Sequence, residues 1–283
     1  MFPFGLALLS GLTWGSADFV GGLMSKRLPT ATVMVVSQTA GLLVTAALVV
    51  GIGEPRPEER FLVYGALGGL AGAIGLASLY KGLAVGRMSI VAPAAALSGA
   101  VPVIVGFAQG ERPAVLQLVG MAVAGGGVLL AVRTPDPSDR GIPGARRNRG
   151  VGYALVAALF LGFFVTSLDA AGEASPLWAS LMVRLVSVPL FVIAAAVTVR
   201  ATRRPTMAET GIMAGVGILD NSANVMFAFA AREGLLTLVS VLGSLYPVAT
   251  VLLARWFLHE RLARWQVAGV AAAFMGVALI AAG

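Results

Sequence analysis

Ten apolar stretches of about 20 residues follow one another along the chain, separated by short polar connectors. A helix needs about 20 mostly apolar residues to cross the hydrocarbon core of a bilayer, so each stretch predicts one transmembrane helix. An open sheet would leave backbone groups unpaired in lipid, which excludes strands here. The pattern therefore predicts an all-α integral membrane protein with ten transmembrane helices. The expected spans are 4–24, 31–52, 61–85, 88–108, 114–132, 150–170, 176–199, 210–231, 235–255 and 264–282.

The composition supports this interpretation and excludes several functions. Of the 283 residues, 58% are hydrophobic and 12% are charged, against about 25% charged residues in ordinary globular proteins. The net charge of +7 comes from connector residues, so we expect no nucleic-acid partner. The chain has no Cys, and its single His is His259, which argues against a thiolate or multi-His metal centre. Neither an enzyme's catalytic residues nor a cofactor site is predicted.

The chain contains an internal duplication. A Glu-Arg pair, a Gln and two Gly occur at the same spacing in both halves, as Glu111-Arg112, Gln117, Gly120 and Gly127 and again as Glu260-Arg261, Gln266, Gly269 and Gly276. The two copies are residues 1–132 and 150–283, with a polar linker at 133–149. Each copy holds five spans, and because five is odd the second copy enters the membrane from the opposite side. This predicts two inverted five-helix repeats with a cavity near the midplane.

The distribution of Lys and Arg predicts the orientation. Fifteen of them lie in or beside the odd-numbered connectors, four in the even-numbered ones, and Arg184 lies within a span. By the positive-inside rule the odd connectors are cytoplasmic, so both termini are expected outside.

Two further motifs carry a resemblance to a known family. The first span contains WGSADFVGG (residues 14–22), and YKGLAVGRMSIVAP (80–93) leads from the third span into the fourth. Together with the repeated Glu-Arg motif, they resemble the drug/metabolite transporter superfamily, and within it the EamA-type ten-helix exporters of bacteria. The resemblance implies a multi-pass protein of the bacterial inner membrane, with a cavity lined by spans 1, 3, 4, 6, 8 and 9. It also implies cytoplasmic termini, opposite to the charge count, and we follow the charge count for this chain. Glu111-Arg112 and Glu260-Arg261 are expected to hold helix ends together.

Four ionisable residues lie within spans: Asp18, Lys81, Arg184 and Asp220. Such residues are rare in membranes, face the bundle interior and usually pair. Their depths predict the pairs Asp18–Lys81 and Arg184–Asp220. Two interpretations stay open: the pairs join helices, or they line a cavity for a zwitterionic substrate or a proton.

The eighth span is the most polar, with Asp220, Asn221 and Asn224 near its middle, which favours a cavity wall. Asp220 could bind a substrate's amino group or alternate between protonated and substrate-bound forms. Tyr246-Pro247 in the ninth span, and Pro93 and Pro102 in the fourth, are expected to interrupt their helices. The predicted substrate-binding residues are Trp14, Asp18, Tyr80, Lys81, Arg184, Asp220, Asn221, Asn224 and Tyr246.

These observations predict a secondary transporter that exports small metabolites, such as amino acids or drugs, by alternating access. The alternative is a lipid flippase or a passive, channel-like facilitator. The expected partners are a small-molecule substrate and the lipid bilayer, with proton coupling as one mode of action and a monomer as the favoured state.

Overall fold

The computed structural model describes residues 2–86, 88–132, 144–198, 204–258 and 264–282. The first half forms α1 (Phe2–Arg27), α2 (Thr30–Ile52), α3 (Glu59–Val85), α4 (Met88–Ala95), the 3₁₀ helix η1 (Ala96–Gly99), α5 (Ala100–Ala108) and α6 (Val115–Val132). The second half forms α7 (Gly144–Gly172), α8 (Pro176–Thr198), α9 (Met207–Glu233), α10 (Leu236–Gly243), α11 (Tyr246–Leu258) and α12 (Arg264–Ala282). Every regular element in these ranges is helical, as predicted.

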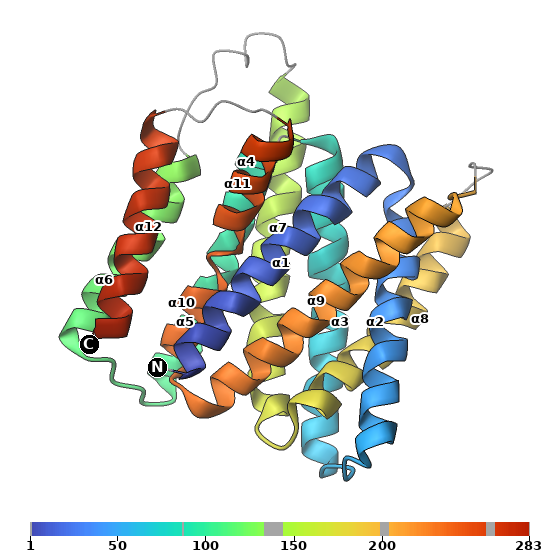
Figure 1. Cartoon of the computed structure of the whole chain (residues 1–283), viewed down its shortest axis with the longest axis horizontal. Coiled ribbons are helices and arrows are strands. Elements are labelled where there is room, and N and C mark those ends of the chain that lie inside the picture. Colours follow the sequence, from blue (N-terminus) through green and yellow to red (C-terminus); the bar gives the residue numbers. More distant parts are fainter. Residues whose placement is uncertain (1, 87, 133–143, 199–203, 259–263, 283) are drawn as a thin grey trace.

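The helices run back and forth through the bundle, and both ends of the chain lie on the same side of it (Figure 1). Because α4, η1 and α5 make one pass and α10 and α11 make another, the helices form the ten predicted passes.

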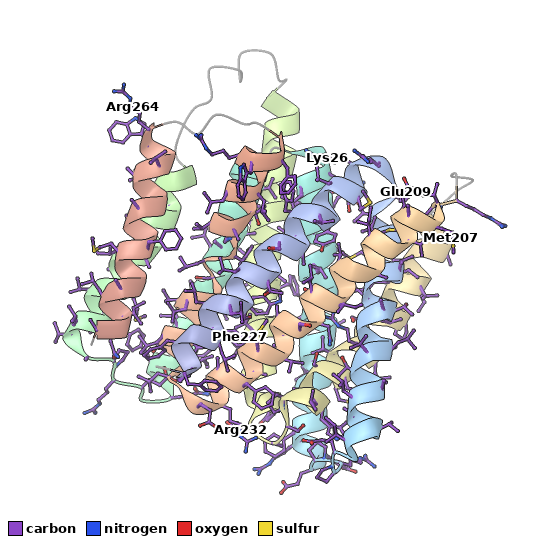
Figure 2. All side chains as sticks on the ribbon, viewed as in Figure 1. Lys26, Met207, Glu209, Phe227, Arg232 and Arg264 are labelled. Atoms are coloured by element: carbon purple, nitrogen blue, oxygen red, sulfur yellow. The ribbon has the colours of Figure 1, made fainter. Side chains whose placement is uncertain are left out.

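In the described ranges, six helices are long and apolar enough to cross a membrane. Lys26, Glu209, Arg232 and Arg264 lie at helix ends, and hydrocarbon side chains cover the middle (Figure 2). α7 begins at Gly144, before its expected start, because a helix can continue past the apolar core into water.

The packing of the helices repeats between the two halves. α1 packs along α9, and its equivalent α7 packs along α3. α2 also contacts α9, as its equivalent α8 contacts α3. α6 pairs with α12 at one edge of the bundle (Figure 1). Each of these contacts between the halves therefore occurs twice, the second time with every helix replaced by its equivalent in the other half. This is the packing expected of two inverted five-helix repeats.

The fourth and ninth passes are both interrupted near their centres. In the fourth pass, α5 begins at Ala100 after η1, and Pro102 occupies its first turn, where a missing N–H costs little. In the ninth pass, α11 begins at Tyr246 and is followed at once by Pro247. The predicted interruptions at Pro102 and Tyr246-Pro247 are confirmed, whereas α4 continues through Pro93.

The two interruptions touch each other inside the bundle. A Cβ placed on Gly99 of η1 would lie 2.9 Å from the Cβ of Ser244, which stands between α10 and α11. The irregular backbone of both repeats therefore meets at one place, which is where inverted-repeat transporters form their cavity.

Glu111 joins the two repeats at the side of the bundle where the chain ends lie. Its carboxylate accepts hydrogen bonds from the backbone N–H groups of Leu236 (2.7 Å) and Thr237 (2.8 Å) at the start of α10. A negative charge at a helix N-terminus is stabilising because the first N–H groups have no partner within the helix. The predicted structural role of Glu111 is confirmed, while Glu260-Arg261 lie outside the described residues.

Candidate substrate cavity

A cavity lies between the two repeats, with about 710 Å³ of empty space that includes its opening to the outside. Its walls come from α1, α3, η1, α7, α9, α10 and the start of α11, which belong to the six spans expected to line it. α2 and α8 also contribute, through Gln38 and through Val183, Arg184 and Ser187. The expected set of lining helices is therefore correct but incomplete.

A close approach of α2 and α9 creates the charged part of the cavity. A Cβ added to Gly217 of α9 would overlap the Ser37 carbonyl oxygen of α2, and one added to Gly41 would lie 3.1 Å from the Gly217 carbonyl oxygen. Small residues allow such approaches in membrane helices. Gln38 follows Ser37, and Asp220 lies about one turn beyond Gly217. The glycines therefore bring the Gln38 and Asp220 side chains together.

Arg184 and Asp220 form the predicted ion pair, with 2.7 Å between Nη2 and Oδ2. Arg184 also donates through Nε to Asn221 Oδ1 (3.3 Å) and through Nη1 to Gln38 Oε1. Gln38 in turn donates through Nε2 to Asp220 Oδ2 at 3.3 Å. Ser180 of α8 donates to Asn221 Oδ1 at 2.8 Å. This network joins α2, α8 and α9 and engages each of the three guanidinium nitrogens of Arg184.

Asp18 lines the same cavity from α1 but belongs to no such network. It is 5% exposed, and among the described residues no hydrogen bond or ion pair engages its carboxylate. The predicted Asp18–Lys81 pair is wrong, because Lys81 is exposed and does not line the cavity. Adjacent helix positions point about 100° apart, and the preceding residue, Tyr80, takes the inward position.

Aromatic side chains line the same cavity as these charged groups. The Trp14 indole donates a hydrogen bond to Asn224 Oδ1 (2.8 Å), and both residues line the cavity. Phe227, labelled in Figure 2, packs against Trp14 with ring centroids 5.4 Å apart. Phe164 meets the same indole edge-on at 6.5 Å. The cavity wall thus combines charged, amide and aromatic side chains, and α1 and α9 each supply more than one kind.

The structure places six of the nine predicted site residues on the cavity wall: Trp14, Asp18, Arg184, Asp220, Asn224 and Tyr246. Tyr80 is fully buried, with its hydroxyl 3.5 Å from the Ala17 carbonyl oxygen, and does not line the cavity. Asn221 lies behind the wall and holds Arg184. These two residues and Lys81 therefore do not face the space where a substrate would lie.

Sequence reasoning missed Gln38, Ser187 and Ser240, all of which line the cavity. The Ser187 and Ser240 hydroxyls are buried and have no hydrogen-bond partner in the part of the chain that the structure describes. Gln38 could have been noticed as an amide in an otherwise apolar span. The serines carry no such signal, because Ser is tolerated throughout membrane helices, where it can bond to its own backbone.

Ten helical passes in two inverted repeats, built around a cavity with charged and broken-helix walls, define a membrane transporter. The chain belongs to the EamA-like transporter family, which matches it over residues 1–133 and 148–282. The family indicates a transporter of the drug/metabolite type, and the two matched segments correspond to the two halves of the fold.

A solved structure described as "Crystal structure of protein" is similar to this chain, with a TM-score of 0.75 and 18% sequence identity. The similarity covers 96% of this chain and 95% of the other, which supports the fold. The comparison with curated proteins returned no match.

Proposed function

We propose that this protein is a secondary transporter of the bacterial inner membrane that exports small metabolites, such as amino acids or drugs, by alternating access. The observation that carries this proposal is the cavity at the junction of the two repeats, whose wall includes Asp18, Arg184 and Asp220. Small-molecule sites lie between the helices of bundles and combine mostly apolar walls with a few polar groups that converge on one space. Polar groups that converge on such a space exceed what helix packing requires.

The interrupted passes supply a means of movement. Each break separates two short half-helices, and the breaks touch at Gly99 and Ser244. Half-helices joined by irregular backbone can tilt with little loss of hydrogen bonding, so the access route can change from one side of the membrane to the other. Because the repeats are inverted, exchanging the conformations of the two halves reverses the side on which the cavity opens.

The cavity residues that would contact the substrate are Trp14, Asp18, Asn224 and Tyr246, with Arg184 and Asp220 forming the charged wall. The indole of Trp14 is already positioned by its hydrogen bond to Asn224. An aromatic surface next to a carboxylate and an amide can bind a small molecule that has both an apolar part and a polar part.

Purified protein in sealed vesicles tests the proposal against its alternatives. Radiolabelled amino acids, amines and drugs are loaded inside, and their release is compared with that of a labelled phospholipid. We expect saturable release of a small solute and no lipid movement. Movement of lipid without any solute would instead indicate a flippase, and unsaturable release of many solutes would indicate a passive facilitator.

Two variants on α9, one on the cavity wall and one outside it, test whether the substrate passes along this part of the cavity. Asn224→Ala should lower transport about tenfold, equivalent to about 1.4 kcal/mol in the limiting step, because it removes the hydrogen bond that positions Trp14. Ser222→Ala is the control, since its hydroxyl bonds only to the Ile218 carbonyl of its own helix. Equal transport by both variants would contradict the proposed position of the substrate.

A further inference from the structure

A group of hydroxyl side chains lines the cavity where the two interrupted passes meet. Four residues of the fourth and ninth passes contribute these hydroxyls: Ser98, Ser240, Ser244 and Tyr246. We call these four residues the hydroxyl cluster. A Cβ added to Gly99 of η1 would lie 3.0 Å from Ser244 Oγ and 3.7 Å from the Ser240 carbonyl oxygen. The cluster therefore spans the contact between the two repeats.

Two hydroxyls of the cluster are buried without a hydrogen-bond partner. The side-chain oxygens of Ser240 and Tyr246 are covered by protein and have no partner in the part of the chain that the structure describes. Tyr246 lies beside the Ser98 side chain, but its hydroxyl forms no hydrogen bond in this conformation. Buried polar groups without a partner are unfavourable and rare in native proteins. Two of them in one cluster indicate that a partner is missing.

The free hydroxyls differ from the other hydroxyls of the bundle. Serines in membrane helices commonly donate to a carbonyl of their own helix. Ser16 and Ser222 donate to the carbonyl four residues earlier, both at 2.8 Å, and Ser244 donates to the carbonyl three residues earlier at 2.9 Å. Ser240 has a full turn of α10 before it and the same option, yet its hydroxyl does not use it. The Tyr246 hydroxyl stands at the end of a rigid ring and cannot reach its own backbone.

The chemistry of the cluster favours an uncharged partner that both donates and accepts hydrogen bonds. An ammonium group has no acceptor, so the O–H donors of both free hydroxyls would stay unpaired. A carboxylate would be buried without a cation, because residues 88–108 and α10 contain no ionisable side chain. It would also be repelled by Asp18, which lies within electrostatic range of Tyr246. An alcohol or a phenol meets both requirements.

From this arrangement we infer that the hydroxyl cluster is a binding subsite for an uncharged hydroxyl group of the substrate, with Ser240 and Tyr246 determining specificity. The inference rests on the proposed transport function and narrows its substrate class to solutes with a hydroxyl group on an apolar body. The aromatic side chains of the same wall, Trp14, Phe164 and Phe227, suit that body. Rotation of Ser240 about χ1, or a tilt of α11 at its break, uncovers the two oxygens for the ligand.

Pairs of compounds that differ by one hydroxyl on a common aromatic body test the ligand class. The pairs are phenylalanine and tyrosine, tryptophan and 5-hydroxytryptophan, and phenethylamine and tyramine. Each compound is titrated calorimetrically into purified protein in lipid nanodiscs. We expect the hydroxyl compound of at least one pair to bind about tenfold more tightly than its parent. The reason is that a site with unpaired polar groups discriminates against a ligand that cannot pair with them.

Ser240→Ala and Tyr246→Phe each remove one oxygen of the cluster. Each should reduce the preference for the hydroxyl compound at least about threefold, and the double variant should abolish it. Because the removed oxygens have no partner in the empty protein, neither change should lower the midpoint of thermal unfolding. Ser25→Ala is the matched control, since the Ser25 hydroxyl on α1 is also buried and unpaired but lies outside the cavity wall. It should bind both members of each pair like the wild type.

The inference is overturned if no pair shows the preference in the wild type, or if the double variant retains it in full. A clear loss of thermal stability in Ser240→Ala or Tyr246→Phe would also overturn it, because these hydroxyls would then already have a structural partner. In vesicles, saturable solute release at the wild-type rate by the double variant would sink the subsite and leave the transporter standing. Movement of labelled lipid without any solute by the wild type would refute the proposed function itself, so the two failures are distinguishable.

Discussion

Removing either partner of the Arg184–Asp220 pair should destabilise the protein strongly, and unequally. The two side chains are 3% and 8% exposed, with 2.7 Å between Nη2 and Oδ2. Arg184→Met keeps much of the side-chain volume but leaves Asp18 and Asp220 as two carboxylates in one cavity. Asp220→Asn leaves the Arg184 cation with Asp18 as the nearby acid. We therefore expect the change at Arg184 to be the more damaging.

The size of the effect follows from the burial of the pair. Leaving one partner of a buried ion pair uncompensated costs about 3–5 kcal/mol, so Asp220→Asn should fall near the lower end and Arg184→Met near the upper end. The double variant should lose about 2–3 kcal/mol less in free energy of unfolding than the two single variants together, because the effects of mutating residues in contact are not additive. Ser180→Ala serves as a control that loses one hydrogen bond to Asn221, which costs about 1 kcal/mol.

Reversible unfolding in mixed micelles, followed by circular dichroism, measures these free energies. The wild type, both single variants, the double variant and Ser180→Ala are compared at the same detergent composition. Strictly additive losses would refute the pair as the stabilising contact. A larger loss for Asp220→Asn than for Arg184→Met would refute the expectation that Asp18 and Asp220, two acids in one cavity, depend on the Arg184 cation.

Three other outcomes follow from the packing and the charge pattern. Gly217→Ala should destabilise the protein by about 1–3 kcal/mol in the same unfolding assay, because the added Cβ would overlap the Ser37 carbonyl. Gly215→Ala, which has open space around it, should be neutral or stabilising. Glu111→Gln should lower thermal stability in detergent by weakening the start of α10. A C-terminal fluorescent protein that matures only in the cytoplasm should stay dark, and bright fluorescence would contradict the predicted orientation.

The fold could be predicted because its determinants are local and repeated. Each span carries its own length and apolarity, and the duplicated Glu-Arg motif reveals the number and direction of the repeats. The breaks at Pro102 and Tyr246-Pro247 follow from the missing N–H of proline. Pro93 shows the limit of this reasoning, because α4 continues through it.

The site could be predicted only in part, because it depends on how each helix is rotated. Depth in the membrane was enough to pair Arg184 with Asp220. It failed for Asp18 and Lys81, since α3 is apolar on most of its surface and its sequence does not show that Tyr80 points inward. Gln38 was missed for a related reason: its partners come from α8 and α9, and one amide in α2 does not reveal them.

Alternating access to the cavity is the central claim, and cysteine labelling tests it most directly because the chain has no Cys of its own. Ser187→Cys and Ser240→Cys place single thiols on the cavity wall, while Ser10→Cys places one at a buried position outside it. Each is reconstituted in one orientation in sealed vesicles that hold a trapped dye. We predict that a membrane-impermeant thiol reagent modifies the two cavity thiols from either side, with Ser10→Cys unmodified and the dye retained. Modification from one side only under all conditions, or from both sides with loss of the dye, would contradict the account.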